Sequence, residues 1–144
     1  MMNAAEAAKT AKKIREERAA AAEKAREARD RKAAADWRKE RADFLIEFGK
    51  DVEEDIAEAV KAGKRSLKIE YLAKCGGSRS PVEAEEAYKG SLLRDLVEKV
   101  FAHFRGKGFS IKTQLFTHEH YCNYETSDEM YHTYTIGAVI SWEE

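Results

Sequence analysis

Proline, glycine and long apolar runs are scarce in this chain of 144 residues. The only proline is Pro81, and Gly49 is the only glycine among the first 62 residues. Because these two residue types most often end a helix, their scarcity permits a very long one. No apolar run approaches the roughly 20 residues of a membrane span, and the N-terminus lacks the apolar segment of a secretory signal. We therefore expect no membrane partner.

Cysteine is equally scarce, since only Cys75 and Cys122 are present and they do not form a Cys-x-x-Cys pair. Two cysteines cannot supply the dense disulfide framework of a small secreted domain. The sequence therefore predicts free thiols in a reducing compartment.

Aromatic residues are missing before Trp37, and charge is divided unevenly along the chain. Residues 1–41 hold 13 Lys and Arg against 8 Asp and Glu, a balance of +5 (13 − 8). Residues 42–144 hold 13 against 19, a balance of −6 (13 − 19). This asymmetry predicts a basic helical arm over residues 1–40 and an acidic domain with a core, the head, over residues 41–144.

The stretch from Ala4 to Ala62 is dominated by Ala, Glu, Lys and Arg, which are strong helix formers. It predicts one helix, or two nearly collinear helices, ending at Gly63 in the left-handed C′ position. A continuous helix of this length would be roughly 90 Å long. Within the arm, small residues recur at a 3-4 spacing that is typical of coiled coils, although alanine buries little area. The alternatives are a solvated single helix supported by pairs such as Glu27–Arg31, and a helix that docks on a partner. The docking interpretation assigns partner binding to Ala11, Ile14, Arg15, Arg18, Ala21, Ala25, Arg29 and Lys32.

The rest of the chain predicts a small α+β head in the order α-β-α-β-β. Apolar residues on one helical face begin at Phe44, and Ser66–Leu72 alternates as a half-buried strand. Ser80-Pro81-Val82-Glu83 is a capping box that opens a second helix, which we expect to run to about Arg105 with Leu96 and Phe101 buried. Two β-rich stretches, 109–124 and 130–142, predict a hairpin. The expected fold is thus a long N-terminal helix and a three-stranded, mainly antiparallel sheet packed with two helices.

Histidine and cysteine gather in the first strand of this hairpin. His118, His120 and Cys122 would share one face, and a register pairing Cys122 with His132 would bring together four ligands that suit zinc. A one-residue slip would place His132 on the opposite face. We expect no metal and no cofactor, because same-face neighbours on a strand lie roughly 7 Å apart. The hairpin is instead predicted to be an interaction surface built on Tyr121, Tyr124, Tyr131 and Tyr134.

Three segments carry a resemblance: Ile56–Ile69, Phe104–Ile111 and Ile136–Trp142. Together they resemble a group of small phage-encoded α+β proteins, in which a helix ends in Gly before a strand and a second helix passes through a Lys-Gly-Phe turn into a hairpin ending Ile-Ser-Trp. The resemblance covers residues 52–142 and implies a viral origin without a particular activity.

We expect a non-enzymatic phage virion or assembly protein that docks through its arm onto sister copies or a larger particle, in the virion or the host cytoplasm. One alternative is a nucleic-acid binder, with phosphate contacts from Arg15, Arg18, Arg26, Arg29 and Arg31. The eight acids interleaved with these cations weigh against it. A third possibility is an inhibitor of a host enzyme that uses the acidic head as a decoy surface.

Overall fold

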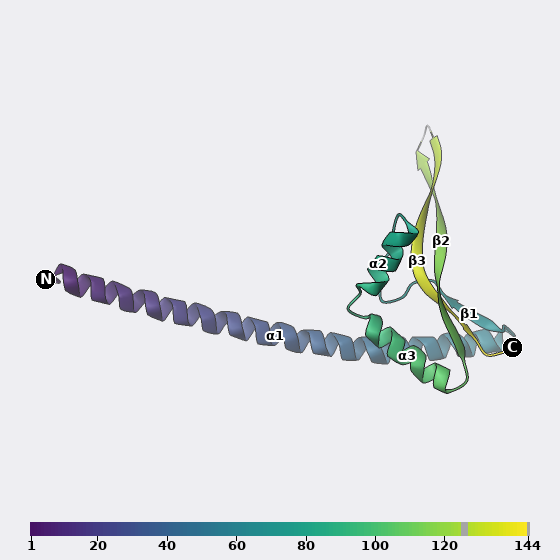
Figure 1. The fold of residues 1–144 in the computed structure, drawn as a ribbon, viewed down its shortest axis with the longest axis horizontal. Coiled ribbons are helices and arrows are strands. Elements are labelled where there is room, and N and C mark those ends of the chain that lie inside the picture. The colour runs from purple at the N-terminus through teal and green to yellow at the C-terminus, as the bar shows by residue number, and fades with distance from the viewer. Residues whose placement is uncertain (125–126, 144) are drawn as a thin grey trace. The chain divides into compact units, whose positions relative to one another are not determined.

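The computed structural model describes residues 1–124 and 127–143, and at 122–124 and 127–129 it describes the backbone alone. The chain forms two compact units, Met1–Glu40 and Arg41–Glu144, which are called the arm and the head below. The element order is α1, β1, α2, α3, β2, β3, and the strands form one sheet (Figure 1). The α+β class predicted from the sequence is confirmed.

Helix α1 is continuous from Ala4 to Lys61, so the single-helix alternative is the one observed. Its first turn is capped by two reciprocal hydrogen bonds between Asn3 and Glu6, which were not predicted from the sequence. The Asn3 side-chain oxygen accepts from the Glu6 N–H at 2.9 Å, and the Glu6 carboxylate accepts from the Asn3 N–H at 3.4 Å. At the other end Gly63 has φ +74°, and the Lys64 N–H donates to the Ala59 carbonyl at 3.0 Å. This is the left-handed glycine cap that the sequence predicts.

The sheet contains β1 (Ser66–Ile69), β2 (Ser110–Tyr124) and β3 (Ser127–Ser141) in the spatial order β1-β3-β2. Both pairings are antiparallel. The first strand is shorter than the predicted Ser66–Leu72, because Ala73 and Lys74 adopt φ values of 55° and 57° and turn the chain. Leu72 is consequently fully buried rather than part of the strand. The last strand begins three residues before the predicted residue 130.

The predicted second helix is wrong in one respect, because it is two helices: α2 (Pro81–Lys89) and α3 (Arg94–Gly106). Gly90 is a poor helix former, and the Ser91 side chain accepts from the Leu93 N–H at 3.2 Å, which favours a turn over a helix at this point. Leu92, which a single helix would place in the apolar stripe, is 69% exposed as a result.

The capping box before α2 differs in one bond from the predicted form. The Ser80 hydroxyl accepts from the Glu83 N–H at 3.2 Å, as predicted. The Glu83 carboxylate accepts from the N–H of Arg79 at 3.3 Å, one residue before the expected donor. The helix start is therefore capped, although the reciprocal bond extends further along the preceding loop.

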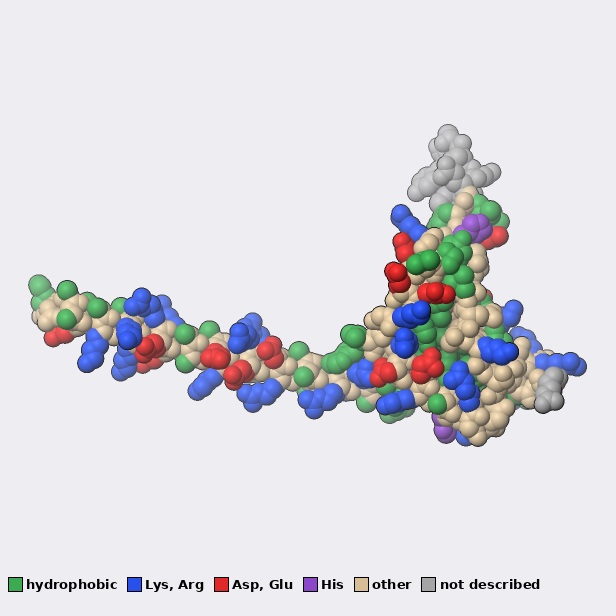
Figure 2. All heavy atoms as spheres, in the orientation of Figure 1, with side chains coloured by type: hydrophobic (Ala, Val, Ile, Leu, Met, Phe, Trp, Pro, Cys, Tyr) green, Lys and Arg blue, Asp and Glu red, His purple; other side chains and the backbone are tan. Residues whose placement is uncertain are grey.

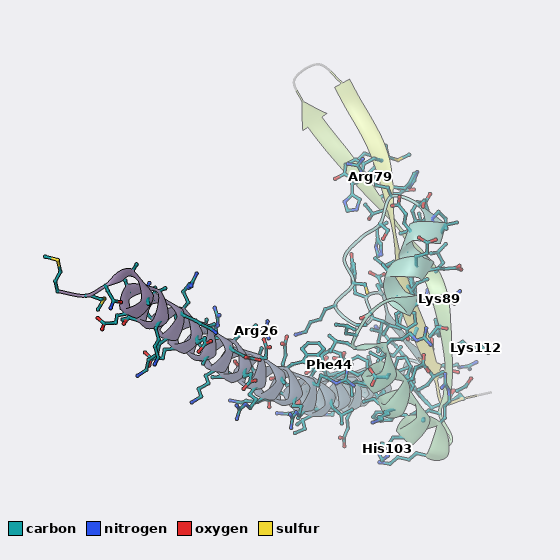
Figure 3. The ribbon with its side chains drawn as sticks, turned by 60° about the vertical axis from the view of Figure 1, so that its left-hand side comes forward. Arg26, Phe44, Arg79, Lys89, His103 and Lys112 are labelled. Atoms are coloured by element: carbon teal, nitrogen blue, oxygen red, sulfur yellow. The ribbon has the colours of Figure 1, made fainter. Side chains whose placement is uncertain are left out.

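The core of the head lies between the sheet and the helices. Its fully buried side chains come from α1, α3, β3 and the loop after β1, and among the largest are Val52, Leu72, Val97, Phe101 and Ile140. The predicted burial of Leu96 and Phe101 is confirmed. Phe44 and Phe48 stack at 5.6 Å and extend this core along the part of α1 that belongs to the head (Figure 3).

A polar contact fixes the start of α3 against α1. The Arg41 guanidinium donates to the Leu92 carbonyl and to the Asp95 carboxylate. The hydrogen bond from Arg41 lowers the pKa of Asp95 below its usual range. The contact therefore satisfies backbone groups at the break between α2 and α3, where the helical pattern is interrupted.

Candidate functional site

The hairpin of β2 and β3 carries the histidines and tyrosines singled out from the sequence, and it extends beyond α2 (Figure 1). Its two faces differ in character because side chains alternate along each strand. One face packs on the core through residues such as Ile111, Ile136 and Ile140. On the other, which we call the outer face, His118 lies opposite Thr133 and His120 lies opposite Tyr131. The register thus builds a His/Thr/Tyr cluster on the outer face.

His118 is held by a connected set of bonds on the outer face. The Thr135 hydroxyl donates to the Glu70 carbonyl at 2.6 Å, and the His118 Nε2 lies 2.8 Å from the same hydroxyl. Since the hydroxyl has one proton and gives it to Glu70, it accepts from an Nε2–H. The other ring nitrogen, Nδ1, lies 3.9 Å from the Glu70 carboxylate, and this contact is an ion pair when the ring is protonated. Tyr71 stacks on the ring at 5.0 Å.

His120 repeats this arrangement one step further along the strand. Its Nε2 lies 2.7 Å from the Thr133 hydroxyl, and its ring stacks on Tyr131 at 4.8 Å. Gly77 lies so close that a Cβ on it would be 2.9 Å from the Thr133 side chain. Ser78 exchanges two backbone hydrogen bonds of 2.8 Å with Tyr134, so the loop before α2 is fixed against the hairpin. Both histidines are thus positioned by side chains and backbone rather than free in solvent.

The observed register separates the candidate metal ligands. His132 pairs with Glu119 and lies on the face opposite to His118 and His120. The backbone of Cys122 pairs with Glu129 and not with His132, and the Cys122 side chain lies outside the described residues. Within the part of the chain that the structure describes, no group of three or more His, Cys, Asp or Glu could hold a metal ion. The four-ligand arrangement considered from the sequence is therefore not formed by this register.

The four tyrosines of the predicted interaction surface are placed differently from one another. Tyr121 and Tyr131 are 69% and 48% exposed, and they lie on opposite faces of the hairpin. Tyr134 is half-buried and packs against the core, so it offers little ring area to a partner. The side chain of Tyr124 lies outside the described residues. Tyr121 is paired with the exposed Met130, which adds apolar area next to it.

A hollow of about 640 Å³ lies beside this end of the hairpin. Its lining includes Gly77 and Arg79 from the loop before α2, together with Tyr131, His132 and Thr133 from β3. The Nδ1 atom of His132 is buried there without a hydrogen-bond partner. The hollow is therefore lined by residues that include the exposed Tyr131 and the cation Arg79.

The arm is exposed along its whole surface. Every residue from Met1 to Asp36 is exposed, including Ile14 at 42%. Lys, Arg and acidic side chains alternate along it (Figure 2). The expected pair of Glu27 and Arg31 is present at 3.8 Å. The predicted docking residues, listed from Ala11 to Lys32 above, thus lie on one helix, and all of them are exposed.

The part of α1 in the head carries a run of acidic residues on its outer surface. Burial raises the pKa of Asp55, and the neighbouring carboxylates of Glu58, Asp51 and Glu54 raise it further. The raised pKa reflects burial first and repulsion between these carboxylates second.

Comparison with protein-family models, curated proteins and solved structures gave no match. Of the helices in the described part of the chain, none is long and apolar enough to cross a bilayer. Function therefore has to be argued from the surfaces themselves.

The sequence reading identified His118 and His120 but missed their partners. Thr133 and Thr135 recur at the same spacing of two as the histidines, and the register places each histidine diagonally across from the threonine that it contacts. That spacing was the available signal. Glu70 and Tyr71 carried none, because they reach the hairpin as the continuation of β1, and the pairing of β1 with β3 cannot be read from their spacing.

Proposed function

We propose that this protein is a non-enzymatic docking protein of a phage virion or its assembly, and that its arm is the docking element. The observation that carries the proposal is the exposure of every side chain from Met1 to Asp36 in a helix that has no core of its own. Helices in water gain most of their stability from packing an apolar face. The exposed part of α1, up to Asp36, is therefore suited to packing on a partner.

The composition of the arm indicates how such packing would occur. Alanines at Ala11, Ala21 and Ala25 allow another helix to approach closely, and Ile14 supplies one larger apolar contact. The cations Arg18 and Lys32 belong to this seam, Arg15 and Arg29 lie beside it, and all four would meet acidic groups on the partner. The proposed partner is a sister copy or another component of the particle. The assignment to phage rests on the resemblance of the head segments described above.

Substitution on opposite sides of the arm tests the proposal. Ala21→Glu with Ala25→Glu places two carboxylates in the seam, whereas Ala19→Glu with Ala34→Glu places the same two charges on the far side of the helix. We expect the first variant to lose association and the second to retain it, as measured by light scattering coupled to size-exclusion chromatography of the full chain. Equal behaviour of the two variants would contradict a docking seam on this face.

A nucleic-acid function is the second candidate, because the arm carries a balance of +4 (12 Lys and Arg − 8 Asp and Glu in residues 1–40) and exposes its arginines. A gel shift at low and high salt separates it from the docking function, since phosphate contacts make affinity fall steeply with salt. The absence of a shift at low salt removes this candidate. Inhibition of a host enzyme through the acidic head is the third, and it requires binding by a variant that lacks residues 1–40.

A further inference from the structure

The outer edge of β2 is a long, unpaired sheet edge. The spatial order β1-β3-β2 leaves β2 bonded to β3 alone within the described chain. Its pairing runs without a break from Ser110 to Tyr124, and the strand contains neither Pro nor Gly. Fifteen residues is well beyond the usual strand length of roughly 5–6. Natural sheets normally protect such an edge with short strands, prolines, bulges or charges.

Bonds on the other side of β3 determine which residues of β2 face this edge. Tyr134 exchanges its backbone bonds with Ser78, so it does not exchange them with its β2 neighbour Thr117. The Ile136 carbonyl likewise accepts from Leu72 at 3.2 Å. In an antiparallel pair of strands, when a residue of β3 directs its N–H and C=O away from β2, the residue opposite it on β2 directs its own N–H and C=O away from β3. Thr117 and the other odd-numbered residues of β2 therefore direct their N–H and C=O groups toward the open edge.

A contact of Arg105 gives the same assignment independently. Its guanidinium donates to the carbonyl of Ile111 at 3.0 Å, from the edge side of β2. Ile111 is six residues before Thr117 and so belongs to the same alternating set. Arg105 thus covers the edge at Ile111. Among the described residues no other hydrogen bond reaches the outward backbone groups from Thr113 to Tyr121.

A cavity borders the middle of this edge on the helical face of the sheet. It has a volume of about 270 Å³ and lies between α2, α3 and β2. Leu115, which is 39% exposed, and Ile136 form part of its apolar lining, with Tyr88 beside them. Lys89 of α2 also lines this cavity (Figure 3). A strand added to β2 would place side chains at the mouth of this cavity.

We propose that a second copy of this chain adds its own β2 to this edge, antiparallel and across a two-fold axis at Leu115. The two sheets then join into one, as in other cases of β-strand addition. Leu115 meets Leu115 of the second copy, and Thr113 exchanges backbone bonds with Thr117 of the second copy. Both exposed leucines are covered, and each lies at the mouth of the other copy's cavity.

The charged residues near β2 favour a second copy as the partner and a two-fold axis at Leu115. With the axis at Leu115, Glu119 of one copy reaches Ile111 of the other, where the Arg105 guanidinium already lies. Each end of the joined strands therefore gains an opposite-charge contact. An axis at Glu119 would oppose two carboxylates, and an axis at Thr117 would place Glu119 against Leu115. Only a second copy supplies these matched groups at both ends, and the inference is independent of the arm.

Cysteine cross-linking in the full chain tests the register. In a Cys75→Ala/Cys122→Ser background, Leu115→Cys places two thiols at a two-fold axis with Cα atoms about 5.5 Å apart, within disulfide range. Lys112→Cys is the matched control, because its two copies would lie six residues apart along the strand, roughly 20 Å. We expect copper-phenanthroline oxidation to give a covalent dimer on a non-reducing gel with Leu115→Cys and not with Lys112→Cys. Equal cross-linking of the two, or none with Leu115→Cys, overturns the proposal.

A second variant removes the edge bond without relying on a disulfide. Thr117→Pro deletes an N–H that has no partner in the single copy, and proline is tolerated on the solvent side of an edge strand. Thr117→Val keeps the N–H and is the control. We expect the proline variant to have the same circular dichroism spectrum as the control. We expect its dimer to have a dissociation constant at least 10-fold higher than that of the control. Retained dimerisation, or unfolding of the proline variant alone, contradicts the outward assignment on which the proposal depends.

Discussion

Gly137 and Gly49 differ in how much space a side chain would have at each position. At Gly137 in β3 an added Cβ would lie 2.1 Å from the Ile69 carbonyl oxygen and 2.5 Å from the Phe116 ring. At Gly49 in α1 an added Cβ would meet nothing within 4 Å. The first glycine is required by close approach of the backbone of another segment, whereas the second only adds flexibility to a helix.

Alanine substitution at these two positions should have opposite effects. Gly137→Ala should lower the free energy of unfolding by about 3 kcal/mol or more, because the carbonyl of Ile69 belongs to backbone that cannot easily move. Gly49→Ala should raise it by about 0.5–1 kcal/mol. Urea unfolding followed by circular dichroism measures both. If Gly137→Ala were as stable as the parent chain, the packing of β1 against β3 would be incorrectly described.

A second prediction at the residue scale concerns Tyr88. Burial raises the pKa of this phenol, and the hydrogen bond of 2.9 Å to Glu98 raises it further. Since the folded pKa exceeds the ordinary value of about 10, the folded state holds its proton more tightly than the unfolded state does. The associated stability is complete below about pH 10 and is lost as the pH rises toward the folded pKa. The free energy of unfolding should fall more steeply above pH 10 in the parent chain than in Tyr88→Phe. Parallel curves for the two proteins would contradict this assignment.

At the scale of elements, the parts fixed by local signals were predictable and the parts fixed by long-range contacts were not. Helix α1, its end at Gly63 and the hairpin follow from composition, glycine placement and alternation. The break between α2 and α3 depends on Ser91, whose hydroxyl reaches the Ala73 carbonyl at 3.4 Å in a distant loop. The hairpin register, which separates His132 from the other histidines, is set by how β2 pairs with β3. The spacing of residues along one strand does not determine that pairing.

The helix break predicts different costs for two neighbouring leucines. Leu96 is buried, so Leu96→Ala should lower the free energy of unfolding by roughly 2–5 kcal/mol. Leu92 is 69% exposed, so Leu92→Ala should change it by less than about 0.5 kcal/mol. One uninterrupted helix would bury both residues and give similar losses. Chemical denaturation of the two variants therefore decides between the two descriptions.

The arm gives a further prediction at this scale. A peptide of residues 1–40 should be only partly helical by circular dichroism, because its alanine seam buries little area without a partner. Its helicity should rise when it binds the partner or when its own concentration is raised. A fully helical signal that does not depend on concentration would contradict the docking role of the arm.

At the scale of the whole molecule, the net charge of −1 conceals two units of opposite sign. The arm contributes a basic exposed surface and the head an acidic one, with Asp55 already affected by repulsion from its neighbours. The molecule therefore offers two routes to association that obey different physics. Contacts of arm cations with acidic groups on another copy are electrostatic, whereas pairing of β2 edges depends on backbone hydrogen bonds and apolar burial.

Salt should separate these two routes. Screening shortens the range of charge interactions from roughly 10 Å at 0.1 M salt to roughly 3 Å at 1 M, so arm-dependent association should weaken over this range. We expect sedimentation of the full chain to show larger assemblies at low salt that resolve to a two-copy species at high salt. Arg15→Gln with Arg18→Gln and Arg29→Gln should give the two-copy species even at low salt, because it removes arm cations and leaves the β2 edge intact. Thr117→Pro should instead remove the two-copy species at high salt. Assemblies of the same size at both salt concentrations in all three proteins would contradict a charge-driven role for the arm.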